Sequence, residues 1–233
     1  MSCRASLSRT AAAVVFCGLL AGLDVRPAAA QDPLAPLDEI QEARDPLAPE
    51  STPEEPGSPS VEQVTQWVAS TGDNNGRPFI VIDKIGAEVF LYDPAGQFMG
   101  KAPALLGSAA GDDSTPGVGD RELNEIKPEE RTTPAGRFVA NFGIARGNER
   151  VLWVDYPTAI SLHPVVTGSR KEQRLKRLKS PTADDNRITY GCINVPAAFY
   201  AQAVRPLFED KGGVVYILPD TKPLNEVFTS LPG

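Results

Sequence analysis

Cys192 and His163 are the two residues in this sequence whose types could do chemistry together. Once an N-terminal export segment is set aside, the chain holds one cysteine and one histidine. A sole thiol cannot form an internal disulfide, so Cys192 is either an inert buried residue or a nucleophile. An imidazole, with an ordinary pKa of about 6.5, can take a proton from a thiol and return it to a leaving amine. Each residue alone is more often structural, but the glycine before the cysteine and the single base favour a nucleophile.

The sequence around Cys192 also supplies groups that stabilise negative charge. A helix is predicted from Pro196 to about Lys211, so the cysteine lies just before a helix N-terminus, where N–H groups without helical partners favour an anion. Gly191 lets the backbone take unusual torsions and approach a substrate closely. The N–H groups of Tyr190, Gly191 and Cys192 are therefore candidates for holding a developing oxyanion.

Three segments resemble those of a known enzyme family. Thr189-Tyr190-Gly191-Cys192-Ile193-Asn194, preceded by a histidine at a strand end, resembles the signature of the YkuD-type L,D-transpeptidases. In that family a His-Gly pair precedes Ser/Thr-His-Gly-Cys, an apolar residue, and Arg or Asn. Thr132–Phe138 resembles an upstream Thr-Pro-x-Gly segment, and residues 80–97 resemble the first hairpins of the domain. The likeness covers roughly residues 79–218, and the cysteine motif is its most specific part.

The resemblance implies a role for each motif residue. Cys192 would be the nucleophile that forms a thioester with a peptidoglycan tetrapeptide stem, with His163 as its general base. The thioester would form at the L-centre carbonyl of diaminopimelate with release of the terminal D-alanine, and an amine of a second stem peptide or another acceptor would resolve it. Thr189 would take the position of the family's serine and orient the histidine. Asn194 and Arg187 are candidates for weaker substrate contacts.

Neither a cofactor nor a metal is expected. One cysteine and one histidine cannot supply the four strong nitrogen and sulfur ligands of a structural zinc site.

The sequence departs from the family pattern in three places. Pro164 follows the histidine where glycine is usual, and Tyr190 stands where a histidine is common. The segment between His163 and Cys192 is longer than usual, and its insert at 169–180 carries six basic residues: Arg170, Lys171, Arg174, Lys176, Arg177 and Lys179. The insert is either a cationic patch that attracts the carboxylates of stem peptides or a solvated helix face above Leu175 and Leu178.

The N-terminus has the layout of a secretory signal peptide over residues 1–30. A basic start is followed by an apolar run from Ala11 to Leu23 and by Ala28-Ala29-Ala30. The apolar run is shorter than the roughly 20 residues needed to cross a bilayer, which disfavours a membrane anchor. We therefore expect a secreted or periplasmic protein with no stable membrane span after cleavage.

The net charge disfavours nucleic acid as a partner. The whole chain has a formal net charge of −7, and removal of residues 1–30 makes the remainder more acidic. A nucleic-acid partner is disfavoured by this balance, and peptidoglycan stem peptides are the expected partners.

The remaining chain divides into four parts by composition. Residues 31–59 form a Pro-rich, acidic segment that we expect to be a disordered tether, with a docking motif for a partner as the alternative. Residues 60–76 predict a short helix and a turn, residues 77–220 the catalytic domain, and residues 221–233 a C-terminal tail.

Hydrophobic patterning predicts a mostly β sandwich or barrel-like domain with a few short helices. The first three predicted strands, which read as a β-meander, are 79–83, 88–92 and a run towards 106; the others are 137–142, 151–154, 159–162 and 214–218. Residues 107–130 read as polar loop. The predicted helices are 61–70, with Ser60 and Gln63 in capping-box spacing, 171–179, and 196–211, which Pro206 should kink or break.

Two classes of function compete. One is an exported cysteine acyltransferase, which becomes a carboxypeptidase or amidase when water is the acceptor. The other is a non-catalytic module that binds peptidoglycan or a protein on a degenerate transpeptidase fold, and Pro164 is the feature that most favours it.

Overall fold

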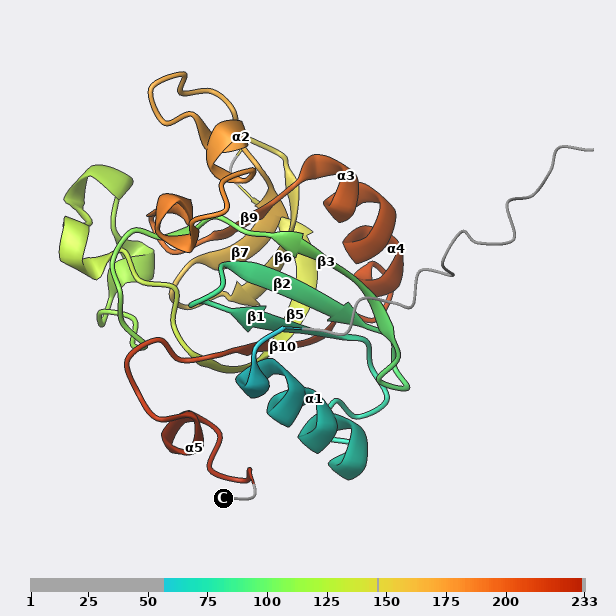
Figure 1. Ribbon diagram of the computed structural model, residues 1–233. Helices are drawn as coiled ribbons and strands as arrows, with labels where there is room; N and C mark the ends of the chain where they lie inside the picture. Colours follow the sequence, from blue (N-terminus) through green and yellow to red (C-terminus); the bar gives the residue numbers. More distant parts are fainter. Residues whose placement is uncertain (1–56, 146, 232–233) are drawn as a thin grey trace, which may run out of the picture. The chain divides into compact units, whose positions relative to one another are not determined.

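The computed structural model describes residues 57–145 and 147–231 (Figure 1). The expected signal peptide and residues 31–56 of the expected tether lie outside the described residues. In the described part of the chain, no helix is both long enough and apolar enough to cross a membrane.

The chain begins its sheet with three antiparallel strands, which confirms the predicted meander. They are β1 (Phe79–Asp83), β2 (Glu88–Tyr92) and β3 (Phe98–Pro103). The Asp83 carboxylate accepts hydrogen bonds from the next turn, and Asp93 does the same in the second turn. The third strand stops at Pro103, and β4 (Leu106–Gly107) pairs instead with β8 (Arg187–Thr189).

The sheet is completed by five strands from the rest of the chain. Its order is β3-β2-β1-β10-β5-β6-β7-β9, with β5 (Gly136–Ile144), β6 (Arg150–Asp155), β7 (Ile160–Pro164), β9 (Ile193–Val195) and β10 (Gly213–Ile217). The pairs β1–β10 and β7–β9 are parallel, and the other neighbours in this sheet are antiparallel. This nearly closed, barrel-like sheet with short helices confirms the mostly β fold class.

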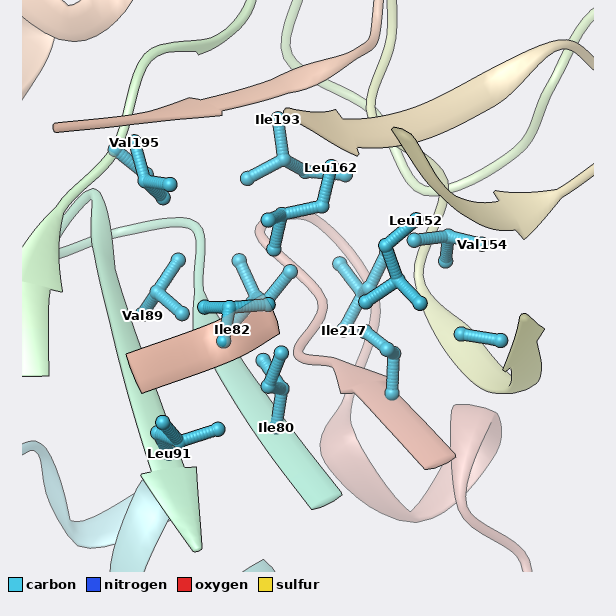
Figure 2. Packing of buried hydrophobic residues seen from close by; sticks show 14 of the residues in the cluster. Ile80, Ile82, Val89, Leu91, Leu152, Val154, Leu162, Ile193, Val195 and Ile217 are labelled. Atoms are coloured by element: carbon cyan, nitrogen blue, oxygen red, sulfur yellow. The ribbon is translucent and has the colours of Figure 1, made fainter. Parts of the chain in front are cut away.

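Both faces of the central strands are buried, because alternate side chains enter two different apolar clusters. Ile80 and Ile82 of β1 join the larger cluster, which also contains Leu162 of β7 and Ile193 of β9 (Figure 2). The odd residues of the same strand enter a second cluster, formed with α1 (Pro59–Thr71) and with Phe228. The first cluster is what fixes β7 and β9, the strands that carry His163 and flank Cys192.

The helices differ from the prediction in their ends and lengths. The helix α1 begins at Pro59 with Ser58 as its N-cap, so the predicted capping box at Ser60 is wrong. The insert forms only one helical turn, α2 (Arg174–Arg177).

Pro206 does not break the helix that follows Pro196. Three segments run on without interruption, as α3 (Ala197–Phe199), a π-helical segment (Tyr200–Val204) and α4 (Arg205–Phe208). The N–H of Arg205 bonds the carbonyl of Tyr200, five residues back. A proline offers no N–H and its ring collides with the carbonyl four residues earlier, so a wider turn just before it accommodates the ring.

Two segments expected to be irregular contain short helical turns. Residues 107–130 include three 3-10 turns, η1 (Val118–Asp120), η2 (Leu123–Glu125) and η3 (Pro128–Glu130). A fourth, η4 (Ala183–Asn186), precedes β8, and α5 (Leu224–Val227) lies within the last described residues. The segment η1–η3 borders the thiol.

Candidate active site

A tight loop between β8 and β9 carries Cys192, and Gly191 makes that loop possible. Gly191 has φ of +127°, in the region that side chains disfavour. A Cβ at this position would lie 2.6 Å from the carbonyl oxygen of Thr132 and 2.7 Å from Ile160 Cδ1. The unusual torsion expected for Gly191 is therefore confirmed, and the close packing explains why no larger residue fits.

Replacing Gly191 by alanine should therefore destabilise the protein and displace the thiol. We expect the free energy of unfolding to fall by about 1–3 kcal/mol, the usual cost of a strained backbone position, measured by urea denaturation. Gly117 offers a matched control, because it also has positive φ (+74°) but a Cβ added there would meet nothing within 4 Å. Equal losses at the two sites would show that torsion alone, and not the packing against Thr132, restricts position 191.

Two buried threonine hydroxyls hold the cysteine loop in place. Thr133 Oγ1 donates to the carbonyl of Gly191 at 2.8 Å and accepts from the N–H of Gly107 at 2.9 Å. Thr189 Oγ1 donates to the carbonyl of Cys192 at 2.7 Å and accepts from the N–H of Gly191 at 3.1 Å. Thr189 thus organises the loop rather than the histidine ring.

The bond from Gly191 also bears on the predicted oxyanion site. The N–H of Gly191 already donates to Thr189 Oγ1 within the loop. The N–H groups of Tyr190 and Cys192 are the remaining candidates from the predicted set.

Ser161 is a site residue that sequence reasoning missed. It is buried on β7, and its Oγ lies 3.6 Å from Cys192 Sγ. The sulfur is also 3.5 Å from the carbonyl oxygen of Ala159. Ser161 and His163 are two residues apart on one strand and therefore share a face. That alternation was visible in the sequence and would have placed Ser161 beside the base.

The parallel pairing of β7 with β9 brings Asn194 to His163. The two residues are register partners in this pair. His163 Nδ1 lies 2.8 Å from the carbonyl oxygen of Pro164, and His163 Nε2 lies 3.1 Å from Asn194 Nδ2. Asn194 is 1 % exposed, so it contacts the base from the protein interior and offers little surface to a substrate.

The thiol and the imidazole change each other's acidity. Burial alone would raise the pKa of the Cys192 thiol, but the hydrogen bond and charge of His163, with help from Ser161, lower it below its usual value. Burial alone would lower the pKa of His163, but Cys192, Pro164 and Glu149 raise it. Both shifts favour proton transfer from sulfur to the ring, which is the requirement for a thiolate nucleophile.

Cys192 remains partly exposed and borders a small cavity under the η1–η3 segment. The cavity has a volume of about 70 Å³ and is lined by Cys192, Tyr190 and residues of that segment such as Val118 and Arg121. Arg121 forms a two-bond ion pair with Glu130, and the Arg131 guanidinium lies 4.1 Å from the centre of the Tyr190 ring. The cavity is much smaller than the roughly 300–1,000 Å³ of a typical ligand site.

Arg187 lies in a different environment from the one expected for a substrate contact. Its guanidinium donates to Asp220 Oδ2 at 2.8 Å and to the carbonyl of Lys84 at 2.9 Å. Lys84 is buried and pairs with Asp112 at 2.6 Å. Arg187 therefore belongs to an ion-pair cluster that joins β8 to the loops after β1 and β10.

The basic insert divides into contacts with the protein and an exposed groove. Leu178 is buried beneath it, whereas Leu175 is 54 % exposed, so only part of the expected apolar underside forms. An open groove of about 720 Å³ is lined by insert residues that include Lys171, Lys176 and Lys179. Arg174 points the other way, towards Asn194.

The described residues contain no group of three or more His, Cys, Asp or Glu side chains that could hold a metal ion.

Comparison with known proteins gives structural similarity only. No protein-family model and no curated protein matches the chain. The solved catalytic domain of the L,D-transpeptidase from E. faecium is similar over 61% of this chain and 98% of that one, with 15% identity and a TM-score of 0.38. The helical cell shape determining protein Pgp2 from Campylobacter jejuni is similar over 69% of this chain, with 17% identity and a TM-score of 0.39, and the match spans 57% of its length.

Proposed function

We propose that this protein is an exported cysteine acyltransferase that acts on peptidoglycan stem peptides, as the YkuD-type L,D-transpeptidases do. The observation that carries the proposal is the pairing of β7 with β9, which brings His163 beside the cysteine loop. There the imidazole lowers the pKa of Cys192, the only thiol beyond residue 30. The cysteine motif of the sequence adds the substrate class, because it resembles the signature of that family. A place in the cell envelope follows from the export signal and from this substrate.

The residues supply the groups that acyl transfer needs. The thiol proton passes to His163, and the sulfur attacks the carbonyl carbon of the diaminopimelate–D-alanine bond. The oxyanion accepts hydrogen bonds from the N–H groups of Tyr190 and Cys192. The intermediate collapses to a thioester as the D-alanine amine takes the proton from His163. An acceptor amine then attacks the thioester and restores the thiol.

Pro164 is compatible with this chemistry. The residue after the histidine is used here through its carbonyl oxygen, which accepts the hydrogen bond from His163 Nδ1. Proline provides that carbonyl as well as glycine does, and its fixed φ restricts the position of the oxygen. The feature that most favoured a non-catalytic module therefore leaves the base in place.

The groove beside α2 suits an anionic substrate. Its lysines lie in a protein of net negative charge, so they form a local positive region on the insert. Diaminopimelate and D-alanine carry carboxylates, which such a region attracts.

Hydrolysis is a second candidate, favoured by the small cavity beside the thiol. A space of about 70 Å³ accepts water, so water can reach a thioester on Cys192. With water as the acceptor, the same thioester gives an L,D-carboxypeptidase.

The two candidates are separated by their products. We expect the mature protein to release D-alanine from a synthetic tetrapeptide stem, with mass spectrometry of the products in the presence and absence of an amine acceptor. A cross-linked product supports the transpeptidase, and a tripeptide alone supports the carboxypeptidase. If the tetrapeptide stays intact in both mixtures, neither enzyme is correct and the binding module is favoured.

A further inference from the structure

One arginine of the insert between His163 and Cys192 contacts a residue of the site. Arg174, in the single turn of α2, donates from Nη1 to Asn194 Oδ1 at 2.8 Å. Its Nε donates to Glu172 Oε2 at 2.6 Å, which fixes the direction of the guanidinium. The Arg174 guanidinium therefore bonds both to the insert and to β9, whereas Arg170 of the same insert is exposed.

This contact determines which way the Asn194 amide faces. A guanidinium has only donors, so the atom of Asn194 that meets it must be the carbonyl oxygen. The NH₂ group of Asn194 then faces His163 Nε2, at 3.1 Å. An amide NH₂ only donates, so Nε2 must offer its lone pair.

The other ring nitrogen agrees with this assignment. The carbonyl oxygen of Pro164 accepts only, so the proton of the neutral ring is on Nδ1, 2.8 Å away. The lone pair on Nε2 is thus specified from both sides of the ring, and it accepts the hydrogen bond from the Asn194 NH₂.

We propose that Arg174 is a positioning residue for the base: by holding Asn194 Oδ1 it directs the amide NH₂ at His163 Nε2 and fixes the Nδ1–H tautomer of the ring. Nε2 can then take the Cys192 proton once the Asn194 N–H releases its lone pair. Its importance for catalysis rests on the proposed acyl transfer, but the orientation of the ring does not. Transfer of the proton to Nε2 makes the contact with the Asn194 NH₂ repulsive.

Several charged groups surround this ring. Cys192 and Glu149 act on His163 from the cysteine loop and from the β5–β6 turn. Arg174 and its partner Glu172 act through Asn194. Replacing Asn194 by aspartate puts oxygen acceptors and a negative charge against Nε2. This should move the ring proton to Nε2 and raise the pKa of His163.

The ring can be observed directly, because His163 is the only histidine in the chain. In long-range ¹H–¹⁵N spectra of the ¹⁵N-labelled mature protein, above the pH at which the ring is protonated, we expect the Nδ1–H tautomer. An Nε2–H tautomer in the unmodified protein would overturn the proposal without any variant.

Two arginine variants of equal charge test the role of Arg174. Arg174→Met frees the amide to rotate, so we expect a second tautomer to appear and the acylation rate to fall by about two- to tenfold, since only part of the molecules keep the lone pair on Nε2. Arg170→Met removes the same charge from the same insert and should leave the ring signals unchanged. Asn194→Asp should fix the Nε2–H form and lower the acylation rate by about 10²-fold or more.

The outcomes separate this proposal from the proposed function. If Arg174→Met has the ring spectrum of the unmodified protein while its backbone spectrum shows a folded chain, Arg174 does not position the base, whether or not the protein is an enzyme. If the tautomer responds as expected but no substrate is acylated, the positioning stands and the transferase is wrong.

Discussion

Mature protein in which Cys192 is replaced by alanine should form no covalent adduct with a carbapenem, whereas the unmodified protein should gain the mass of one molecule. The adduct forms when a thiolate attacks the strained carbonyl of the lactam, the same step as acylation by a stem peptide. A protein prepared without residues 1–30 lacks Cys3 and Cys17, so Cys192 is its one thiol. Intact-mass spectrometry therefore reads the reaction at a single sulfur.

Matched controls make this result specific. Cys192→Ser keeps the shape of the site with a much weaker nucleophile, and should also show no adduct on the same time scale. An adduct that persists in Cys192→Ala would place the reaction on another residue. If the unmodified protein stays unlabelled, the thiol is not a working nucleophile.

Replacing His163 by glutamine should lower the rate of acylation by a factor on the order of 10² or more, the usual contribution of a positioned general base. Glutamine can still donate a hydrogen bond to the Pro164 carbonyl but cannot accept the thiol proton. The rate is measured as single-turnover formation of the adduct at neutral pH.

The pH dependence of this variant distinguishes loss of the base from loss of structure. Without the imidazole, burial holds the pKa of the Cys192 thiol above its ordinary value of about 8.5. The variant should therefore recover most of the lost rate only at a pH well above that value. An unchanged rate at neutral pH would remove His163 from the mechanism. A loss that persists at high pH would mean that the substitution damaged the cysteine loop.

Local patterning predicted the strands well because alternation and turn residues specify them within a few positions. The runs at 79–83 and 88–92 form strands at those same residues, since Asp83 and Asp93 close their turns with side-chain hydrogen bonds. The pairing between distant strands left no comparable local signal. The parallel contacts β1–β10 and β7–β9 depend on packing around the shared apolar cluster.

The site was predictable where its chemistry depends on residue type, and less so where it depends on strand register. Cys192, His163 and Gly191 follow from composition and from the motif. The contact of Asn194 with the base could be predicted only from the register of β7 against β9. The roles of Thr189 and Arg187 differ from expectation because their nearest partners, the cysteine loop and Asp220, are brought to them by tertiary packing.

The helical insert shows the same limit. In the sequence its basic residues look like one cationic patch, because a sequence does not show in which direction each side chain points. In the fold Arg174 turns inward to Asn194, while Lys171, Lys176 and Lys179 line an open groove.

The most direct measurement of the coupled thiol is the rate of Cys192 alkylation by iodoacetamide as a function of pH, in the unmodified mature protein and in His163→Gln. Because His163 lowers the pKa of Cys192, the unmodified protein should react at a pH where an ordinary thiol is still protonated, and the variant should need a higher pH. Superimposable profiles for the two proteins would show that the imidazole does not ionise the sulfur, and would contradict the account.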